Sequence, residues 1–213
     1  MNILIMGGPG AGKGTMSKKI VENYEVTHIS TGDIFRSEVG SGTALGLEAK
    51  KYMDAGKLVP DEVTNPMVKS FLETQDLANG YLLDGYPRTL AQAKAFDELV
   101  KGSDLEIDKV ITLDIPFEKL AKRITGRRLC KTCGHIYHVD YHPPKVEGIC
   151  DIDGSELYQR KDDTIESLEV RLAEYENNAQ PILDYYKDKV VIINADQSTD
   201  DVWKEIESAL GGK

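Results

Sequence analysis

The sequence predicts an α/β fold, in which a central parallel sheet is flanked by helices. Short, largely apolar runs alternate with longer helix-like stretches along most of the 213 residues. A glycine-rich segment at residues 7–15 directly follows the first apolar run. Because buried parallel strands are short and continuously apolar, this alternation indicates a sheet that is covered by helices on both faces.

Each element can be assigned in order along the chain. The strands are expected at residues 3–6, 81–83, 110–113 and 190–193, and residues 28–29 are the candidate for a fifth. The helices are expected between these strands, at residues 13–24, 90–100, 118–124, 165–186 and 201–210.

Two segments interrupt the alternation, and we interpret both as insertions. Residues 30–60 have the pattern of short helices punctuated by glycines, whereas residues 126–163 show little helical periodicity and contain all three cysteines. The predicted organisation is therefore a core formed by residues 1–29, 61–125 and 164–213 that carries two inserted subdomains.

Composition excludes some classes of function. The chain has 26 Lys and Arg against 36 Asp and Glu, a formal net charge of -10, which disfavours general nucleic-acid binding. No apolar run approaches the roughly 20 residues of a membrane span. The first residues lack the basic region of a signal peptide, so we expect a first strand and a cytoplasmic location. Five of the seven arginines nevertheless lie between residues 123 and 171, so positive charge is concentrated locally.

The segment GGPGAGKGT at residues 7–15 has the context of a phosphate-binding loop, between a strand and a helix. Glycines allow successive backbone N–H groups to face a polyanion, and the helix N-terminus adds its dipole. Lys13 would supply charge to the terminal phosphates, and the Thr15 hydroxyl would approach magnesium. A plain glycine-rich turn is the alternative, and Lys13, Thr15 and the placement argue against it. The residues expected to bind ATP here are Gly10, Ala11, Gly12, Lys13, Gly14 and Thr15.

Six motifs in a fixed order make the sequence resemble adenylate kinases over essentially its whole length. They are GGPGAGKGT at 7–15, HISTGDIFR at 28–36, GKLVPDEVT at 56–64, LLDGYPRT at 82–89, TGRR at 125–128 and LYQRKDD at 157–163. The segment 126–163 is similar to the lid of the long-lid bacterial form. The resemblance implies a P-loop nucleoside monophosphate kinase fold with a five-stranded sheet, an AMP-binding insertion at 30–60 and a lid at 126–163.

The resemblance also implies the reaction, a reversible magnesium-dependent phosphoryl transfer in which ATP and AMP give two ADP. Such enzymes close a lid over their nucleotides and thereby exclude water. The expected partners are therefore ATP, AMP and ADP, with Mg²⁺ as a cofactor. We expect a monomer, because the hinge motions of two insertions require free surface.

Further site residues are implied by the same resemblance. The positions that match the family's AMP site are Thr31, Arg36, Lys57, Leu58, Val59, Gly85, Arg88 and Gln92, with Gln92 reading the adenine edge. On the ATP side, Arg123 and Arg127 match cations on the phosphates, and Ile136, Tyr137 and Gln197 match contacts to the base. Arg160 and Arg171 match residues that bridge the transferred group. Gly8, Met16 and Tyr86 depart from the commoner family residues, but none of these changes removes a charge or a ligand.

Phosphoryl transfer needs in-line positioning and cations, and no covalent nucleophile from the protein. Arginine suits this task because its planar guanidinium binds two phosphate oxygens at once. A single arginine more often forms a surface salt bridge, but the motifs favour catalytic roles for Lys13, Arg88, Arg123, Arg127, Arg160 and Arg171. Arg128 is a weaker candidate, because adjacent residues rarely face the same ligand.

Two aspartates are candidates for the water shell of magnesium. Asp84 ends an apolar strand, as a Walker-B aspartate does. Asp33 is expected to assist through water, and a helix-capping role beside Ser30 and Thr31 is an equal alternative.

The cysteines form a metal-binding pattern. Cys130-x2-Cys133 is followed, after sixteen residues, by Cys150-x2-Asp153, which matches a four-ligand zinc motif with aspartate last. Four protein ligands leave no open position, so we expect a structural Zn²⁺ that stiffens a segment too small for its own core. The alternatives are a Cys130–Cys133 disulfide and reduced cysteines without metal. If metal binds, the other possible fourth ligands are Asp151, His135, His138 and His142.

Three other functions compete with an adenylate kinase. A kinase for UMP, CMP or GMP is disfavoured by Thr31 and Gln92. A regulatory module that binds ATP without transferring phosphate would not need so many phosphate-facing cations. A zinc-ribbon nucleic-acid binder built on residues 130–153 is disfavoured by the acidity of the chain and the lack of an aromatic-basic platform.

Overall fold

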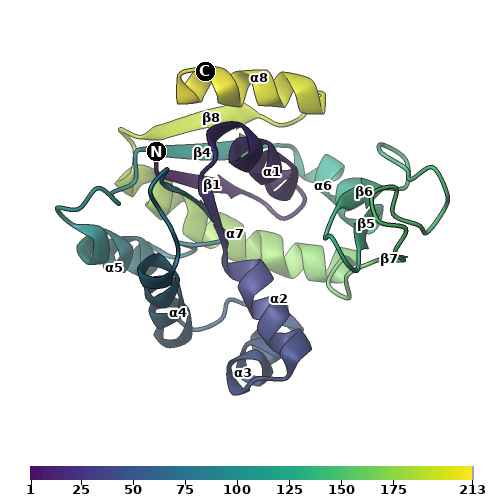
Figure 1. The fold of residues 1–213 in the computed structure, drawn as a ribbon, viewed down its shortest axis with the longest axis horizontal. Coiled ribbons are helices and arrows are strands. Elements are labelled where there is room, and N and C mark those ends of the chain that lie inside the picture. Colours follow the sequence, from purple (N-terminus) through teal and green to yellow (C-terminus); the bar gives the residue numbers. More distant parts are fainter. Residues whose placement is uncertain (213) are drawn as a thin grey trace.

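The computed structural model describes residues 1–212, and its centre is a five-stranded sheet whose neighbouring strands are all parallel (Figure 1). The strand order is β2-β3-β1-β4-β8. The strands are β1 (Ile3–Gly7), β2 (Thr27–Ser30), β3 (Tyr81–Asp84), β4 (Lys109–Asp114) and β8 (Val190–Asn194). The predicted parallel α/β sheet is thus confirmed, and the candidate segment at residues 28–29 is its edge strand β2.

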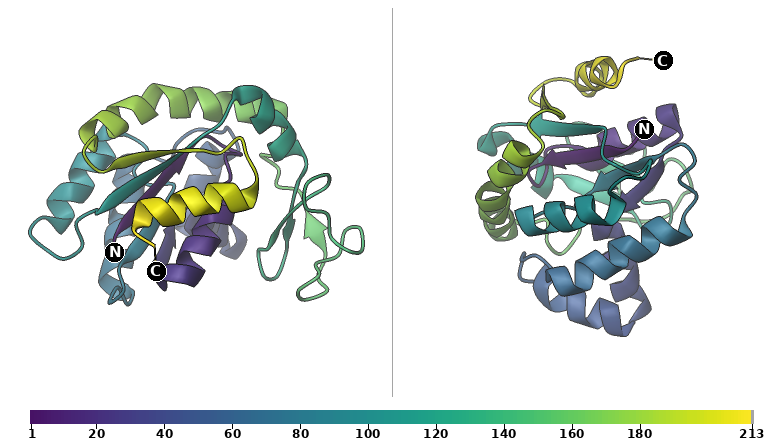
Figure 2. Two further views of the ribbon diagram at one scale, coloured as in Figure 1. Left: turned by 90° about the horizontal axis from the view of Figure 1, so that it is seen from above. Right: turned by 90° about the vertical axis from the view of Figure 1, so that its left-hand side faces the viewer.

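Helices cover both faces of this sheet, as Figure 2 shows from two further directions. Five of them agree with the expected helices to within two residues at each end, namely α1 (Lys13–Tyr24), α5 (Leu90–Val100), α6 (Phe117–Thr125), α7 (Ile165–Tyr185) and α8 (Thr199–Leu210). Alternate side chains of a strand point to opposite faces, so each strand contributes to two cores. In β1, Leu4 joins the core that contains Phe96 of α5, whereas Ile5 joins the core that contains Ile20 of α1 and Ile206 of α8.

Side-chain caps begin several of these helices. Thr89 accepts a hydrogen bond from the backbone N–H of Gln92 at the start of α5, and Thr164 accepts one from the backbone N–H of Ser167 at the start of α7. The N-cap of α2 (Thr31–Ser41) is Ser30, whose Oγ accepts from the N–H of Asp33 at 3.3 Å. The capping alternative for Asp33 is therefore wrong, because Asp33 lies in the first turn and donates to the cap.

The first insertion begins with the helical hairpin formed by α2 and α3 (Ala44–Met53), as expected for residues 30–60. It is followed by α4 (Asp61–Thr74), a helix that was not expected from the sequence. Pro66 lies inside α4, and an interior proline ordinarily breaks a helix because it lacks the N–H donor. Burial of Met67, Val68 and Leu72 against the core stabilises α4 despite this proline.

The second insertion forms a small sheet of its own beside the main sheet (Figure 1). It consists of β5 (Arg127–Cys130), β6 (Ile136–His138) and β7 (Leu157–Tyr158), which are antiparallel in the order β6-β5-β7. Its buried cluster contains only Cys130, Tyr137 and Cys150, with Leu157 packed against them. Within residues 1–212, no helix has the length and apolar character that a membrane span requires.

Candidate active site

The glycine-rich loop connects the end of β1 to the start of α1, as the sequence predicts. Gly10 and Gly12 have φ values of 85° and 102°, a left-handed region that glycine adopts without steric cost. A Cβ at Gly10 would also lie 2.9 Å from Ile124 Cγ1. The loop ends at Lys13, whose Nζ donates to the carbonyl oxygens of Gly7 at 2.6 Å and Gly8 at 3.1 Å. The loop thus curls around the Lys13 ammonium.

Lys13 lies where several cations meet. Burial lowers the pKa of its ammonium to about 8; the Asp84 carboxylate opposes this shift, whereas Arg88, Arg171 and Arg127 add to it. These three arginines come from a loop, a helix and the small sheet, and the fold brings their charges together around Lys13. Such an arrangement creates a strongly positive, partly desolvated site for a polyanion.

Asp84 ends β3 beside this loop. Burial alone would raise the pKa of its carboxyl group, but the nearby His28 imidazole and the charge of Lys13 hold the pKa below its usual value. The Oδ2 atom lies 3.4 Å from Ser17 Oγ and 3.7 Å from His28 Nε2. Ser17 and His28 were not anticipated from the sequence. Thr15 lies in the first turn of α1, where its N–H donates to the Gly12 carbonyl.

One cavity of about 80 Å³ gathers the residues predicted to bind AMP, with the exception of Arg160. The predicted residues that line it are Thr31, Arg36, Lys57, Leu58, Val59, Gly85, Arg88, Gln92 and Arg171. A second cavity of about 100 Å³ contains Lys13 in its lining and shares Gly56, Leu58, Gly85, Arg88 and Arg171 with the first. The two cavities therefore adjoin each other, the second beside the phosphate loop and the first beside the first insertion.

The loop after β3, which contains Gly85 and Arg88, contributes to the lining of both cavities. The Gly85 carbonyl accepts from Thr31 Oγ1 at 2.8 Å and from Arg88 Nε at 2.7 Å. Burial, reinforced by the charge of Arg171, lowers the pKa of the Arg88 guanidinium to about 10. The buried Gln92 side chain lies at one end of the same loop, where its Oε1 accepts from the Arg88 N–H.

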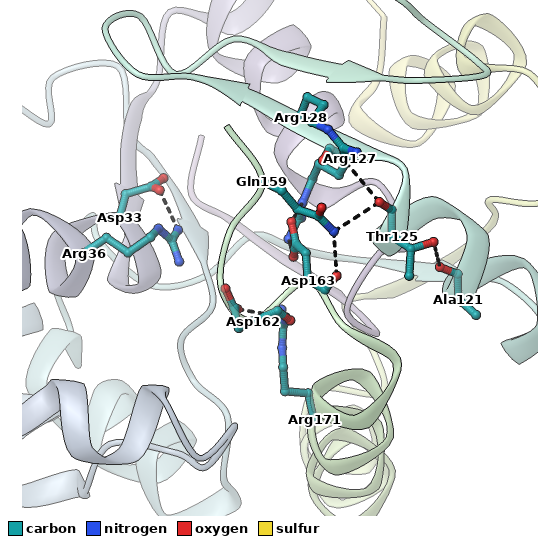
Figure 3. Close-up of polar contacts among 10 residues, drawn as sticks. All are labelled: Asp33, Arg36, Ala121, Thr125, Arg127, Arg128, Gln159, Asp162, Asp163 and Arg171. Carbon is teal, nitrogen blue, oxygen red and sulfur yellow. Dashed lines mark hydrogen bonds and ion pairs between the residues drawn. The ribbon is translucent and has the colours of Figure 1, made fainter. Parts of the chain in front are cut away.

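Cations face one another across the site, as Figure 3 shows for Arg36 on one side and Arg127 and Arg171 on the other. Arg36 Nη2 lies 2.5 Å from Asp33 Oδ1. Burial would raise the pKa of Asp33, but the charge and hydrogen bond of Arg36 lower it below its usual value. Burial lowers the pKa of Arg160 to about 10, and the charges of Arg36 and Arg127 contribute to this shift. The Arg160 guanidinium is thus close enough to interact electrostatically with cations on both sides of the site.

Two aspartates that were not assigned from the sequence hold two of these arginines (Figure 3). Arg127 forms two hydrogen bonds with the buried Asp163, one of them from Nε to Oδ2 at 2.9 Å. Arg171 Nη1 donates to Asp162 Oδ2, also at 2.9 Å. Both aspartates end the motif LYQRKDD, and two acidic residues directly after the basic pair Arg160 and Lys161 were the available signal. The Arg128 side chain instead donates to backbone carbonyls of Thr125 and Arg127.

Other predicted ATP contacts lie outside these two cavities. Arg123 Nη2 donates to the Ala195 carbonyl at 2.9 Å, and Gln197 Nε2 donates to Glu205. The Ile136 Cδ1 atom lies 3.1 Å from the position that a Cβ would take at Gly14, so β6 reaches the phosphate loop. The Tyr137 side chain points instead into the small sheet, where its hydroxyl accepts from the Asp151 N–H at 2.8 Å.

The candidate metal ligands lie together in the second insertion. The ligand atoms of Cys130, Cys133, Cys150 and Asp153 are all within 4.8 Å of one another. The Cys130 Sγ atom is 3.3 Å from both carboxylate oxygens of Asp153. All three cysteines are free, so the disulfide alternative is wrong. This donor set is compatible with a tetrahedral zinc ion.

The other residues considered as a fourth ligand have different contacts. Asp151 Oδ1 accepts from the Lys145 N–H, and His138 Nδ1 accepts from the Asp140 N–H. The His135 and His142 rings lie around the Tyr137 ring. Among the described residues, Asp153 is the only one of these candidates grouped with the three cysteines.

Comparison with known proteins agrees with this site. The sequence profile described as "Adenylate kinase" matches residues 5–191. The adenylate kinase of Oceanobacillus iheyensis is 53% identical over 215 aligned positions that span 100% of both chains. Those of Exiguobacterium sibiricum and Staphylococcus aureus are 50% and 51% identical, over 100% and 97% of each chain. From the phosphate loop, the cation-lined cavities and this full-length similarity, it follows that the chain belongs to the adenylate kinase family.

Proposed function

We propose that the two cavities and their cations are where this chain carries out the reaction of its family, ATP + AMP = 2 ADP. As an adenylate kinase, the chain is an enzyme of the nucleoside monophosphate kinase class. The observation that carries the proposal is that Lys13, Arg88 and Arg171 line one cavity, with the charge of Arg127 near enough to lower the pKa of Lys13. Binding alone does not require that many desolvated cations, whereas a transition state with charge spread over several phosphoryl oxygens does.

The two nucleotides would enter from opposite sides. The phosphate loop, Lys13 and Arg127 would hold the ATP phosphates, with Arg123 beside them. The cavity with Arg36 and Arg88 would hold AMP, and its lining by nearly all of the predicted AMP residues supports this assignment. Arg160 and Arg171 would then lie between donor and acceptor and stabilise the group in transit, without a covalent intermediate.

Burial among like charges lowers the pKa values of Lys13, Arg88 and Arg160, which means that these cations repel one another in the free protein. The phosphates of bound ATP and AMP would replace this repulsion by attraction, and their own mutual repulsion would be offset at the same time. Mg²⁺ bound with ATP would supply further positive charge. The depressed pKa of Asp84 keeps its carboxylate ionised, as a residue that orients the magnesium water shell requires.

We further propose that residues 30–60 are the AMP-binding subdomain, that residues 126–163 are the lid, and that the remaining residues form the core. Zn²⁺ in the cluster Cys130, Cys133, Cys150 and Asp153 would be structural, because the small sheet has few buried side chains to stabilise it. The protein would act as a cytoplasmic monomer, with the lid and the first insertion free to move.

Product analysis tests the reaction directly. Purified protein would be incubated with Mg-ATP and, separately, with AMP, GMP, UMP and CMP, and the diphosphates would be quantified by chromatography. We expect rapid ADP formation with AMP alone. Preference for another monophosphate would overturn the roles of Thr31 and Gln92, and nucleotide binding without any diphosphate would indicate a regulatory module.

A further inference from the structure

We propose that Asp61 determines base specificity, because it holds the Gln92 side-chain amide in the orientation that pairs with adenine and not with guanine. The inference rests on the proposed function, in which Gln92 faces the base of the monophosphate. Asp61 would be a positioning residue, since it contacts Gln92 and acts through it.

The geometry around Gln92 leaves its amide no freedom to rotate. Its Nε2 donates to Asp61 Oδ1 at 2.7 Å, and its Oε1 accepts from the Arg88 N–H, also at 2.7 Å. The side chain is buried, at 2% exposure, yet it lines the AMP cavity. The carboxylate of Asp61 can only accept, and the backbone N–H of Arg88 can only donate. If the amide were flipped, its oxygen would face the Asp61 carboxylate and its NH₂ group would face the Arg88 N–H, so both hydrogen bonds would be lost.

The locked amide has one hydrogen and one lone pair left for a ligand. Adenine presents a donor at N6 and an acceptor at N1, so it can give a hydrogen bond to Oε1 and accept one from Nε2. Guanine presents the reverse pattern, an acceptor at O6 and a donor at N1. An amide that could flip would serve either base, whereas the amide held by Asp61 serves adenine.

Helices α4 and α5 hold Asp61 and Gln92 next to each other. Asp61 is the first residue of α4, and Gln92 lies in the first turn of α5, where its backbone N–H donates to Thr89 Oγ1 at 3.1 Å. Thr89 Oγ1 also lies 3.5 Å from Asp61 Oδ2. A capping box would explain a bond to Gln92 Oε1 from the backbone N–H of the N-cap residue Thr89, but the donor here is the N–H of the preceding residue, Arg88. Capping also does not account for the bond from Nε2 to a carboxylate on another helix, 31 positions away.

The substitution Asp61→Asn tests the inference, because asparagine keeps the shape but adds a donor that a flipped amide could use. We expect the ratio of kcat/KM for AMP to that for GMP to fall by about tenfold or more, the usual effect of losing a hydrogen bond to a charged group. The change should appear in the KM of the monophosphates, with the KM for ATP and the kcat at saturating AMP within about twofold of the parent protein. The neighbouring Glu62→Gln is the matched control, since Glu62 is exposed on the same helix turn, and it should leave the ratio unchanged.

A second variant separates failure of the inference from failure of the proposed function. Gln92→Ala should itself abolish most of the preference for AMP, and Asp61→Asn should have no further effect on the ratio in that background. If Gln92→Ala keeps the preference for AMP over GMP, Gln92 does not recognise the base, and its assignment to the proposed AMP site is wrong. If Gln92→Ala loses it but Asp61→Asn lowers kcat/KM equally for AMP and GMP, Asp61 has only a structural role and the inference is overturned.

Discussion

Replacing Asp163 by asparagine would measure how strongly the small sheet depends on its buried ion pair with Arg127. The Asp163 side chain is fully buried and that of Arg127 is 16% exposed, so water replaces their two hydrogen bonds poorly. Removing one partner of a buried pair costs about 3–5 kcal/mol. Asparagine keeps one acceptor and Arg127 is not completely buried, so we expect a loss of about 2–3 kcal/mol in the free energy of unfolding.

The expected change in melting temperature follows from the size of the chain. For domains of about 150–250 residues, 1 kcal/mol corresponds to about 2–4 °C, so Asp163→Asn should melt about 4–12 °C lower. The matched control is Asp162→Asn, whose pair with Arg171 is 33% and 24% exposed and should contribute at most about 1 kcal/mol. Circular dichroism and the fluorescence of Trp203, the single tryptophan, would follow both transitions. Equal melting temperatures for the two variants would refute the argument from burial.

Three further predictions concern the charges and the metal. Because the pKa of Lys13 is lowered to about 8, its side chain is protonated below that pH and becomes neutral above it. The positive charge that it would supply to the phosphates is then lost, so kcat/KM for ATP should fall as the pH rises past about 8. Asp84 raises the pKa of Lys13, so Asp84→Asn should move this fall to lower pH, and a pH profile that is unchanged in the variant would contradict the coupling. Arg88→Ala should lower turnover by about 10²–10³-fold with an unchanged circular dichroism spectrum, and near-normal turnover would count against its role. Cys133→Ser should lose the zinc that elemental analysis is expected to find in the parent protein and should melt at a lower temperature; equal zinc content in both proteins would exclude Cys133 as a ligand.

The arginine–aspartate pairs and the buried cations that lack a full counter-charge act on stability in opposite directions. Asp162 and Asp163 neutralise Arg171 and Arg127, whereas Lys13, Arg88 and Arg160 keep charges that are only partly balanced in the free protein. A bound polyphosphate would supply the missing anions, so nucleotides should raise the melting temperature by mass action. The site is therefore organised for its ligands at some expense to the stability of the free protein.

The sequence by itself determined the parallel α/β sheet and the phosphate loop, and its resemblance to a known family predicted many of the residues that line the cavity proposed for AMP. These features depend on local patterns, because a buried parallel strand is a short apolar run and a phosphate loop requires glycines at particular places between a strand and a helix. Helix α4 was missed because the local signal of Pro66 opposes a helix, whereas burial of Met67 and Val68 stabilises it.

Only the tertiary structure decided how the charged side chains are paired. The partners Arg127 and Asp163 are 36 positions apart, and Gln92 and Asp61 are 31 positions apart, so no local pattern relates them. The grouping of Asp153, and not of the nearby histidines, with the three cysteines, and the position of Tyr137 inside the small sheet, likewise depend on how β5, β6 and β7 pair. Electrostatic partners are chosen by distance and burial in the folded chain, and these quantities exist only once the strands and helices have packed.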